Sequence, residues 1–224
     1  MTDKEKKIGY EFKNKSLLNR ALTHSSYANE NRVKSNERLE FLGDSVLSII
    51  ISDYIFNKMK NTNEGDLSKI RATLVCEQSL AEVAKDISLN ELILLGKGED
   101  KMGGRYRPSI ISDAFEALLG AIYLDGGIDV AREWLLNIMS DRVLKSLEGK
   151  LFCDYKTTLQ EIVQKDGKST IQYRTIKESG KEHEREFVVQ LFINDVAKCS
   201  AKGRSKKEAE QLAAKATIEI YYNA

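Results

Sequence analysis

Residues 36–47 read NERLEFLGDSVL, and the rest of the chain is organised around this stretch. Because a helix advances about 100° per residue, Glu37, Glu40 and Asp44 fall on one narrow stripe of its surface. The residues beside the stripe are apolar, which predicts a helix sunk into a core rather than a solvated one. Carboxylates at this spacing repel one another, and a divalent cation such as Mg²⁺, which takes oxygen ligands, offsets the repulsion. The stretch therefore predicts a metal-binding site beside a core. The alternative is that Glu37 follows an Asn36 cap and only complements the helix dipole.

A second apolar segment, residues 109–122, reads SIISDAFEALLGAI, and its only acids are Asp113 and Glu116. These two acids are three residues apart, so they lie on one face of a helix. If this helix packs beside the first one, the acids of both helices converge. A single acidic stripe is explained by a solvent-exposed helix face. Two apolar helices that each carry acids on one face are better explained by a metal-binding site.

Residues 37–45, ERLEFLGDS, resemble the signature box of the ribonuclease III family. The resemblance implies hydrolysis of phosphodiester bonds in double-stranded RNA, by metal-activated water in line with the phosphorus, which leaves 5′-phosphate and 3′-hydroxyl ends. It implies Mg²⁺ as the cofactor, with Mn²⁺ as a possible substitute. The metal ligands implied are Glu40, Asp44, Asp113 and Glu116. The catalytic residues implied are Asp44 and Glu116, with Glu37 and Glu64 assisting.

The same resemblance implies a homodimer with Phe41 at the centre of the interface, and a role in the processing and decay of rRNA and mRNA. Gly43 lies inside the first helix, where glycine costs about 1 kcal/mol relative to alanine, so a close approach of another helix is expected. Glu64 has a second explanation, because an acid in the first turn of a helix also complements the helix dipole.

Composition predicts a helix-rich soluble protein of one large or two modest domains. The chain has 224 residues, of which 42% are hydrophobic and 31% charged, and one proline. The net charge of +1 identifies no partner. The N-terminus has no signal-like apolar run, and the longest apolar run, residues 46–56, is broken by Asp53 and too short to cross a bilayer. No membrane contact is therefore expected. Three distant cysteines fit neither a disulfide framework nor a zinc site, so a reducing, cytoplasmic location is expected.

The first 146 residues are predicted to form an all-α endonuclease domain, followed by a linker over residues 147–153. Within the endonuclease domain, Ser16 is expected to cap a short helix, and His24 is expected to serve packing or hydrogen bonding rather than catalysis. Residues 96–108, rich in glycine and cations, lack P-loop spacing and are expected to form a connecting loop. One helix is expected from about residue 130 to 145.

Residues 154–224 are predicted to form a smaller α+β domain with the order α-β-β-β-α. After a helix to Lys165, β-branched and aromatic residues alternate with polar ones over three segments. Asn194 and Asp195 mark the second hairpin, and Ser205 begins the last helix. Residues 202–207 read KGRSKK, and lysines at a helix N-terminus make a good phosphate seat.

The α-β-β-β-α order, with the KKEAE start of its last helix, resembles the double-stranded RNA-binding domain. Such domains contact two successive minor grooves and the phosphates between them, largely without reading sequence. The resemblance implies that one minor groove meets residues of the first helix, the next minor groove meets His183, and the phosphates meet two lysines. The residues on that helix are Thr157, Gln160, Glu161 and Gln164, and the lysines are Lys206 and Lys207. The first hairpin, residues 180–186, departs from the family because it is acidic and lacks a proline after the glycine.

The favoured interpretation is a bacterial-type double-stranded RNA endoribonuclease. A non-cleaving RNA-binding scaffold is the main rival, and it differs in the role of Glu116. A helical phosphohydrolase acting on nucleotides is a weaker rival, because no His-Asp metal pairing supports it.

Overall fold

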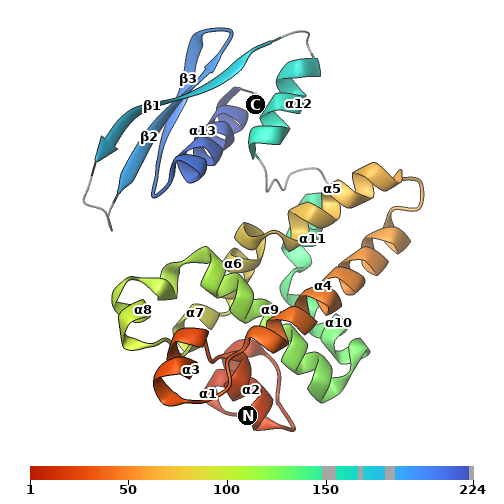
Figure 1. Ribbon diagram of the computed structural model, residues 1–224. Coiled ribbons are helices and arrows are strands. Elements are labelled where there is room, and N and C mark those ends of the chain that lie inside the picture. The colour runs from red at the N-terminus through yellow and green to blue at the C-terminus, as the bar shows by residue number, and fades with distance from the viewer. Residues whose placement is uncertain (148–154, 166–168, 180–184, 222–224) are drawn as a thin grey trace. The chain divides into compact units, whose positions relative to one another are not determined.

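The computed structural model describes residues 1–147, 155–165, 169–179 and 185–221. The chain divides into two compact units, Met1–Cys153 and Asp154–Ala224, which are described separately (Figure 1). The expected linker falls almost wholly outside the described residues and stays a prediction.

The first unit is helical throughout its described part. Its elements are α1 (Asp3–Ile8), α2 (Lys15–Ala21), α3 (Ser25–Asn31), α4 (Glu37–Lys58), α5 (Glu64–Val75), α6 (Glu77–Asp86), α7 (Leu89–Leu92), α8 (Lys97–Lys101), the 3-10 helix η1 (Gly104–Tyr106), α9 (Pro108–Gly126), α10 (Ile128–Ile138) and α11 (Ser140–Leu147).

The helices α4 and α9, orange and green in Figure 1, form the centre of this unit. Two glycines let their main chains touch. A Cβ atom on Gly43 would lie 1.8 Å from the carbonyl oxygen of Glu116, and one on Gly120 would lie 2.4 Å from that of Leu39. The close approach expected at Gly43 is therefore confirmed, and it fixes the register of the two helices that carry the acidic pairs.

The core around this pair explains why both helices are apolar on most sides. Leu47, Ile50 and Phe115 are fully buried. Trp134 of α10 stacks on Phe115 with 5.6 Å between ring centroids, and its indole Nε1 donates to the carbonyl of Ile8 at 2.8 Å. Burial of each large side chain contributes about 1.5–3 kcal/mol, so this core holds α4 and α9 in place.

Three local expectations for the helical unit are wrong. Asn14, rather than Ser16, caps α2, because its side chain accepts from the Ser16 amide at 3.0 Å. The expected helix over 130–145 is two helices, with a break at the fully buried Met139. The expected connecting loop contains α8 and η1, which Arg105 ties down through Asp100 and two main-chain carbonyls.

The second unit has the predicted α-β-β-β-α order and confirms the fold class. Its elements are α12 (Tyr155–Lys165), β1 (Ile171–Ser179), β2 (Glu186–Ile193), β3 (Val196–Gly203) and α13 (Lys206–Tyr221). The strands form an antiparallel sheet in the order β1-β2-β3, in which Tyr173 pairs with Leu191 and Val189 with Ala201. Both helices cover the same face of the sheet (Figure 1).

The turn between β2 and β3 lies at Asn194 and Asp195, where the sequence predicted the second hairpin. Asn194 and Asp195 both have positive φ angles, 50° and 61°. A two-residue hairpin turn of this kind favours Asn and Asp, whose short side chains tolerate the left-handed region. Residues 180–184 of the first hairpin lie outside the described residues.

The cysteines differ from the expectation of reduced thiols. Cys199 is a free thiol, whereas Cys76, which caps α6, is disulfide-bonded.

Among the helices that the structure describes, none has both the length and the apolar character needed to cross a membrane.

Candidate active site and nucleic-acid interface

The five acids predicted on α4 and α9 form one electrostatic cluster. Helix α4 supplies Glu37, Glu40 and Asp44, and helix α9 supplies Asp113 and Glu116. The contact of Gly43 with the main chain of Glu116 places the acidic turns of the two helices beside each other. The expected convergence of the two acidic stripes is therefore visible in how their charges act on one another.

Glu116 is the most perturbed of these acids. Burial raises the pKa of its carboxyl from an ordinary 4.5 to about 8. The charges that add to the rise are those of Asp44, Asp113 and Glu40. A carboxyl with such a pKa holds a proton at neutral pH unless a positive charge approaches it.

The pKa values of Glu40 and Asp113 are raised as well. Burial raises the pKa of Glu40, and the charges of Asp113, Glu37 and Asp44 add to the rise. Burial also raises the pKa of Asp113, with a further contribution from Glu77. The two helices thus hold partly buried carboxylates that repel one another across the interface.

Glu77 is a member of this environment that the sequence did not reveal. It opens α6, which packs on α9, and after burial its charge is the largest contribution to the raised pKa of Asp113. An acid in the first turn of a helix is ordinary, because it complements the dipole. Nothing in the sequence separates Glu77 from such a residue.

His24 has the predicted hydrogen-bonding role, and it also acts electrostatically on Asp113 of the acidic cluster. The imidazole caps α3, because Nδ1 accepts from the amide of Ser26 at 3.2 Å and lies 2.8 Å from its hydroxyl. The hydroxyl of Ser26 in turn accepts from the amide of Gly96 at 2.9 Å. Among the groups around Asp113, His24 lowers the pKa of that carboxyl, opposing the rise caused by burial.

Glu64 lies at the first position of α5, where its carboxylate accepts from the hydroxyl of Ser68 at 2.8 Å. Its charge is not among those that raise the pKa of Glu116 or Glu40. Within the described residues, the charge of Glu37 acts on this cluster, and the charge of Glu64 is not among those that act on Glu116 or Glu40.

The donors present suit a hard divalent cation, because all are carboxylate oxygens. The repulsion among these carboxylates, which contributes to the raised pKa of Glu116, also favours binding of a cation. Within residues 1–147 and the other described segments, however, no three acidic, His or Cys side chains lie close enough together to hold a metal ion.

Phe41 lies on the outer side of α4, with 78% of its surface exposed. Ile49 and Phe56 of the same helix are also exposed, at 57% and 68%. Because their helical positions differ by less than a quarter turn, these three side chains form one apolar stripe facing away from the core.

In the second unit, the residues predicted to meet RNA lie at the surface of two helices. Thr157, Gln160, Glu161 and Gln164 are all exposed and belong to neighbouring turns of α12. Lys206 and Lys207 are exposed in the first turn of α13. His183 lies outside the described residues.

The first turn of α13 is held tightly against β3. A Cβ atom on Gly203 would lie 2.6 Å from the amide nitrogen of Ala209, so only glycine fits at this crossing. Ser205 caps the helix by accepting from the amide of Glu208 at 3.1 Å, and the Glu208 carboxylate accepts from the amide of Arg204 at 2.7 Å. The two lysines therefore project from a fixed helix N-terminus, whose dipole favours anions.

Comparisons with known proteins agree for both units. Residues 14–141 match the ribonuclease-III-like family model, and residues 155–221 match the double-stranded RNA binding motif. The ribonuclease 3 of Caldanaerobacter subterraneus subsp. tengcongensis is 50% identical over 216 residues, which cover 96% of this chain and 95% of that protein. The ribonuclease 3 of Clostridium tetani is 51% identical over 220 residues, covering 98% of this chain and 94% of that protein.

A solved structure supports the helical unit. The nuclease domain of ribonuclease III from Campylobacter jejuni is 45% identical, with a TM-score of 0.59, and the match covers 62% of this chain and 94% of that one. The sequence agrees over nearly the whole chain, the two family models occur in the expected order, and the fold agrees over the helical unit. The chain therefore belongs to the ribonuclease III family, the endoribonucleases of double-stranded RNA.

Proposed function

We propose that Glu40, Asp44, Asp113 and Glu116 hold Mg²⁺, or Mn²⁺ in its place, and that the chain cuts double-stranded RNA there to leave 5′-phosphate and 3′-hydroxyl ends. The observation that carries the proposal is the mutual perturbation of these carboxylates across the contact of α4 with α9. A bound cation supplies positive charge that stabilises the transition state and lowers the pKa of water at the site.

The protein's own contribution is to concentrate charge and control one proton. At neutral pH without a cation, Glu116 keeps its proton, because its pKa is about 8. A bound cation would favour the charged form of Glu116, which would then give up that proton. Asp44 and Glu40 would hold the cation together with Glu116 and Asp113, and the core beneath α4 and α9 keeps the main chains of the two helices from moving apart. Glu37 and Glu64 are proposed to assist from outside this set.

A substitution of Glu116 by Gln tests this assignment. The amide keeps the size of the side chain but removes the charge, so duplex RNA binding should persist while Mg²⁺-dependent cleavage falls by at least about a hundredfold, the size of a lost electrostatic contact at a reacting centre. Glu133→Gln, at an exposed acid of α10, is the matched control and should cleave normally.

The measurement is single-turnover cleavage of a long RNA duplex, with binding followed separately in EDTA. Unchanged cleavage by Glu116→Gln would remove this residue from the catalytic set. Binding without any cleavage by the unsubstituted chain would instead favour the scaffold, and hydrolysis of nucleotides without the second unit would favour the phosphohydrolase.

The RNA-binding part of the proposal rests on the second unit. Thr157, Gln160, Glu161 and Gln164 would meet one minor groove, and Lys206 and Lys207 the neighbouring phosphates. His183 is proposed for the next minor groove. The exposure of the α12 residues and the fixed position of the two lysines support this arrangement.

We further infer a homodimer formed through the exposed stripe of α4 around Phe41. Phe41, Ile49 and Phe56 leave most of their surface in water along one face of α4, and an exposed apolar patch of this kind marks a protein–protein contact. The related nuclease domain from Campylobacter jejuni has a region involved in dimer formation, which supports the same assembly for this chain. A cytoplasmic location, and a role in processing and decay of rRNA and mRNA, complete the proposal.

A further inference from the structure

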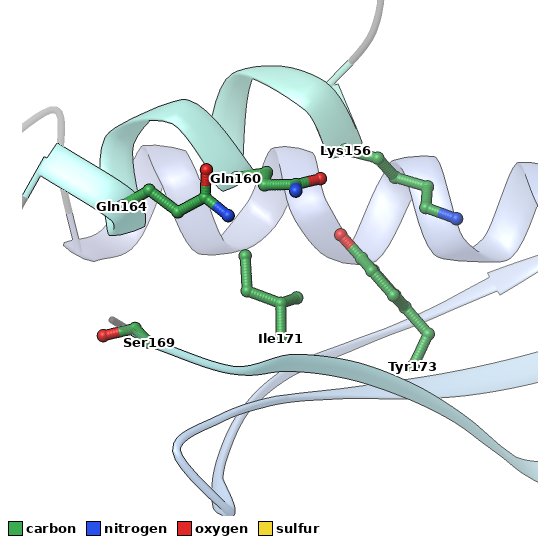
Figure 2. A pocket seen from close by; sticks show the side chains of 6 residues that line it. All are labelled: Lys156, Gln160, Gln164, Ser169, Ile171 and Tyr173. Carbon is green, nitrogen blue, oxygen red and sulfur yellow. The ribbon is translucent and has the colours of Figure 1, made fainter. Parts of the chain in front are cut away.

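A hollow of about 350 Å³ lies between α12 and β1 in the second unit (Figure 2). Its wall on α12 consists of Lys156, Gln160 and Gln164, and its wall on the strand side consists of Ser169, Ile171 and Tyr173. This size lies at the lower end of ligand pockets, which span about 300–1,000 Å³. A single flat ring system fits such a hollow, whereas a duplex does not.

The two glutamines face the strand as well as the surface. In Figure 2 the carboxamides of Gln160 and Gln164 lie above Ile171, on the side of α12 that faces β1. Within the described segments, no hydrogen bond engages either carboxamide. Each amide therefore has donors and an acceptor to offer to a ligand in the hollow.

The remaining polar groups also fit a neutral ligand. The hydroxyl of Ser169 accepts from Nδ2 of Asn194 at 3.2 Å and keeps its own hydrogen for donation. The ammonium group of Lys156 is paired with Glu210 at 2.6 Å and lies 4.6 Å from the ring centroid of Tyr173. Because this cation is already neutralised, the hollow does not suit a phosphate, which needs unpaired positive charge.

We propose that this hollow binds one nucleobase, with its polar edge toward the glutamine carboxamides and its face on Ile171. Glutamine pairs with base edges through two hydrogen bonds, and unpaired bases in RNA are recognised by such contacts. The base belongs either to an unpaired nucleotide in the RNA or to a free nucleoside. This inference rests on the proposed contact of α12 with RNA, and it adds a preference for an unpaired nucleotide to recognition by duplex shape.

The test compares two RNA duplexes of about 16 base pairs, the length that one such domain spans, one fully paired and one with a single bulged adenosine. Binding of the full chain is measured in EDTA, so that no cleavage occurs. The unsubstituted chain should bind the bulged duplex about tenfold more tightly, the gain expected from two net hydrogen bonds.

Three variants locate the effect. Ile171→Phe fills the hollow from β1, and Gln164→Leu removes one amide without adding bulk, so both should abolish the preference for the bulge. Ile176→Phe places the same new ring on the same strand at a site 57% exposed and outside the hollow, so it should keep the preference. Gln164→Leu changes only a surface side chain, so this variant alone tests whether the hollow causes the bulge preference if Ile171→Phe does not fold.

A second arm distinguishes the source of the base. Adenosine alone is titrated into the chain while the methyl signals of Ile171 are followed by NMR. A shift without any bulge preference supports a free nucleoside as the occupant, and a bulge preference supports the RNA. The absence of both would overturn the proposal, and if the fully paired duplex is still bound and cut, the proposed function stands while this inference alone fails.

Discussion

Gly43 of α4 faces the main chain of Glu116 in α9 so closely that an added Cβ atom would lie 1.8 Å from the Glu116 carbonyl oxygen. No other amino acid fits there without moving one helix. Each helix carries acids whose charges act on those of the other, so this contact connects the packing of the core to the chemistry of the site.

Replacement of Gly43 by Ala should therefore damage both stability and activity. The clash is with main chain, which does not yield easily, so we expect a loss of about 3 kcal/mol or more, at the upper end of overpacking costs. Cleavage should fall even below the melting temperature, because Glu116 moves away from Glu40. The measurements are urea unfolding and single-turnover cleavage.

Gly98→Ala is the matched control for this substitution. Gly98 lies in α8 with nothing within 4 Å of an added Cβ atom. The change should be neutral or stabilising by up to about 1 kcal/mol, as for alanine in a helix. Equal effects of the two substitutions would show that the contact with Glu116 is not special.

Stability without a divalent cation should fall as the pH rises toward about 8, through Glu116. Its carboxyl has a pKa of about 8 in the folded chain against an ordinary 4.5. Between these values the folded state holds a proton that the unfolded state has already released, so stability decreases with pH. Melting curves in EDTA from pH 5 to 8 should show a larger decline for the unsubstituted chain than for Glu116→Gln.

Addition of Mg²⁺ should reduce this decline in the unsubstituted chain, because the cation stabilises the ionised carboxylate. The variant should gain less from Mg²⁺ at every pH. Parallel curves for the two proteins, with and without the metal, would contradict the raised pKa of Glu116.

Replacing Lys206 and Lys207 together by alanine should weaken binding to all RNA duplexes alike. Each lysine that contacts a phosphate releases counterions, so the slope of log K against log salt should decrease by about two. Lys6 and Lys7, an adjacent pair in the last turn of α1, provide the matched double alanine control. A loss confined to particular sequences, or an equal loss in the control, would be incompatible with phosphate contacts at α13.

Phe41→Ser should shift the chain from dimer to monomer in sedimentation experiments. The substitution removes the most exposed large apolar side chain of α4, where 78% of the phenylalanine surface is in water. Tyr106→Ser is the control, since Tyr106 is an exposed aromatic residue of η1, at 59%. An unchanged mass for Phe41→Ser would exclude this stripe as the interface.

Much of the site was predictable because helical periodicity fixes which side chains share a face. The spacing of Glu37, Glu40 and Asp44 placed them together, and the glycine cost at Gly43 predicted a close helix. Glu77 and the reach of His24 toward Asp113 were not predictable. They depend on which element packs against α9, and a residue's own helix does not reveal that.

The two acidic helices, the α-β-β-β-α order and the hairpin at Asn194 were predictable from the amino-acid sequence, because they follow from local periodicity and backbone preference. Other features depend on how the elements pack: that Glu116 is the most perturbed acid, that a helix ends at Met139, and that Gln160 and Gln164 border a hollow with β1. Helical periodicity sets the direction in which a side chain points around the axis of its helix. Its burial and its electrostatic coupling depend on which neighbouring element the fold packs against that side.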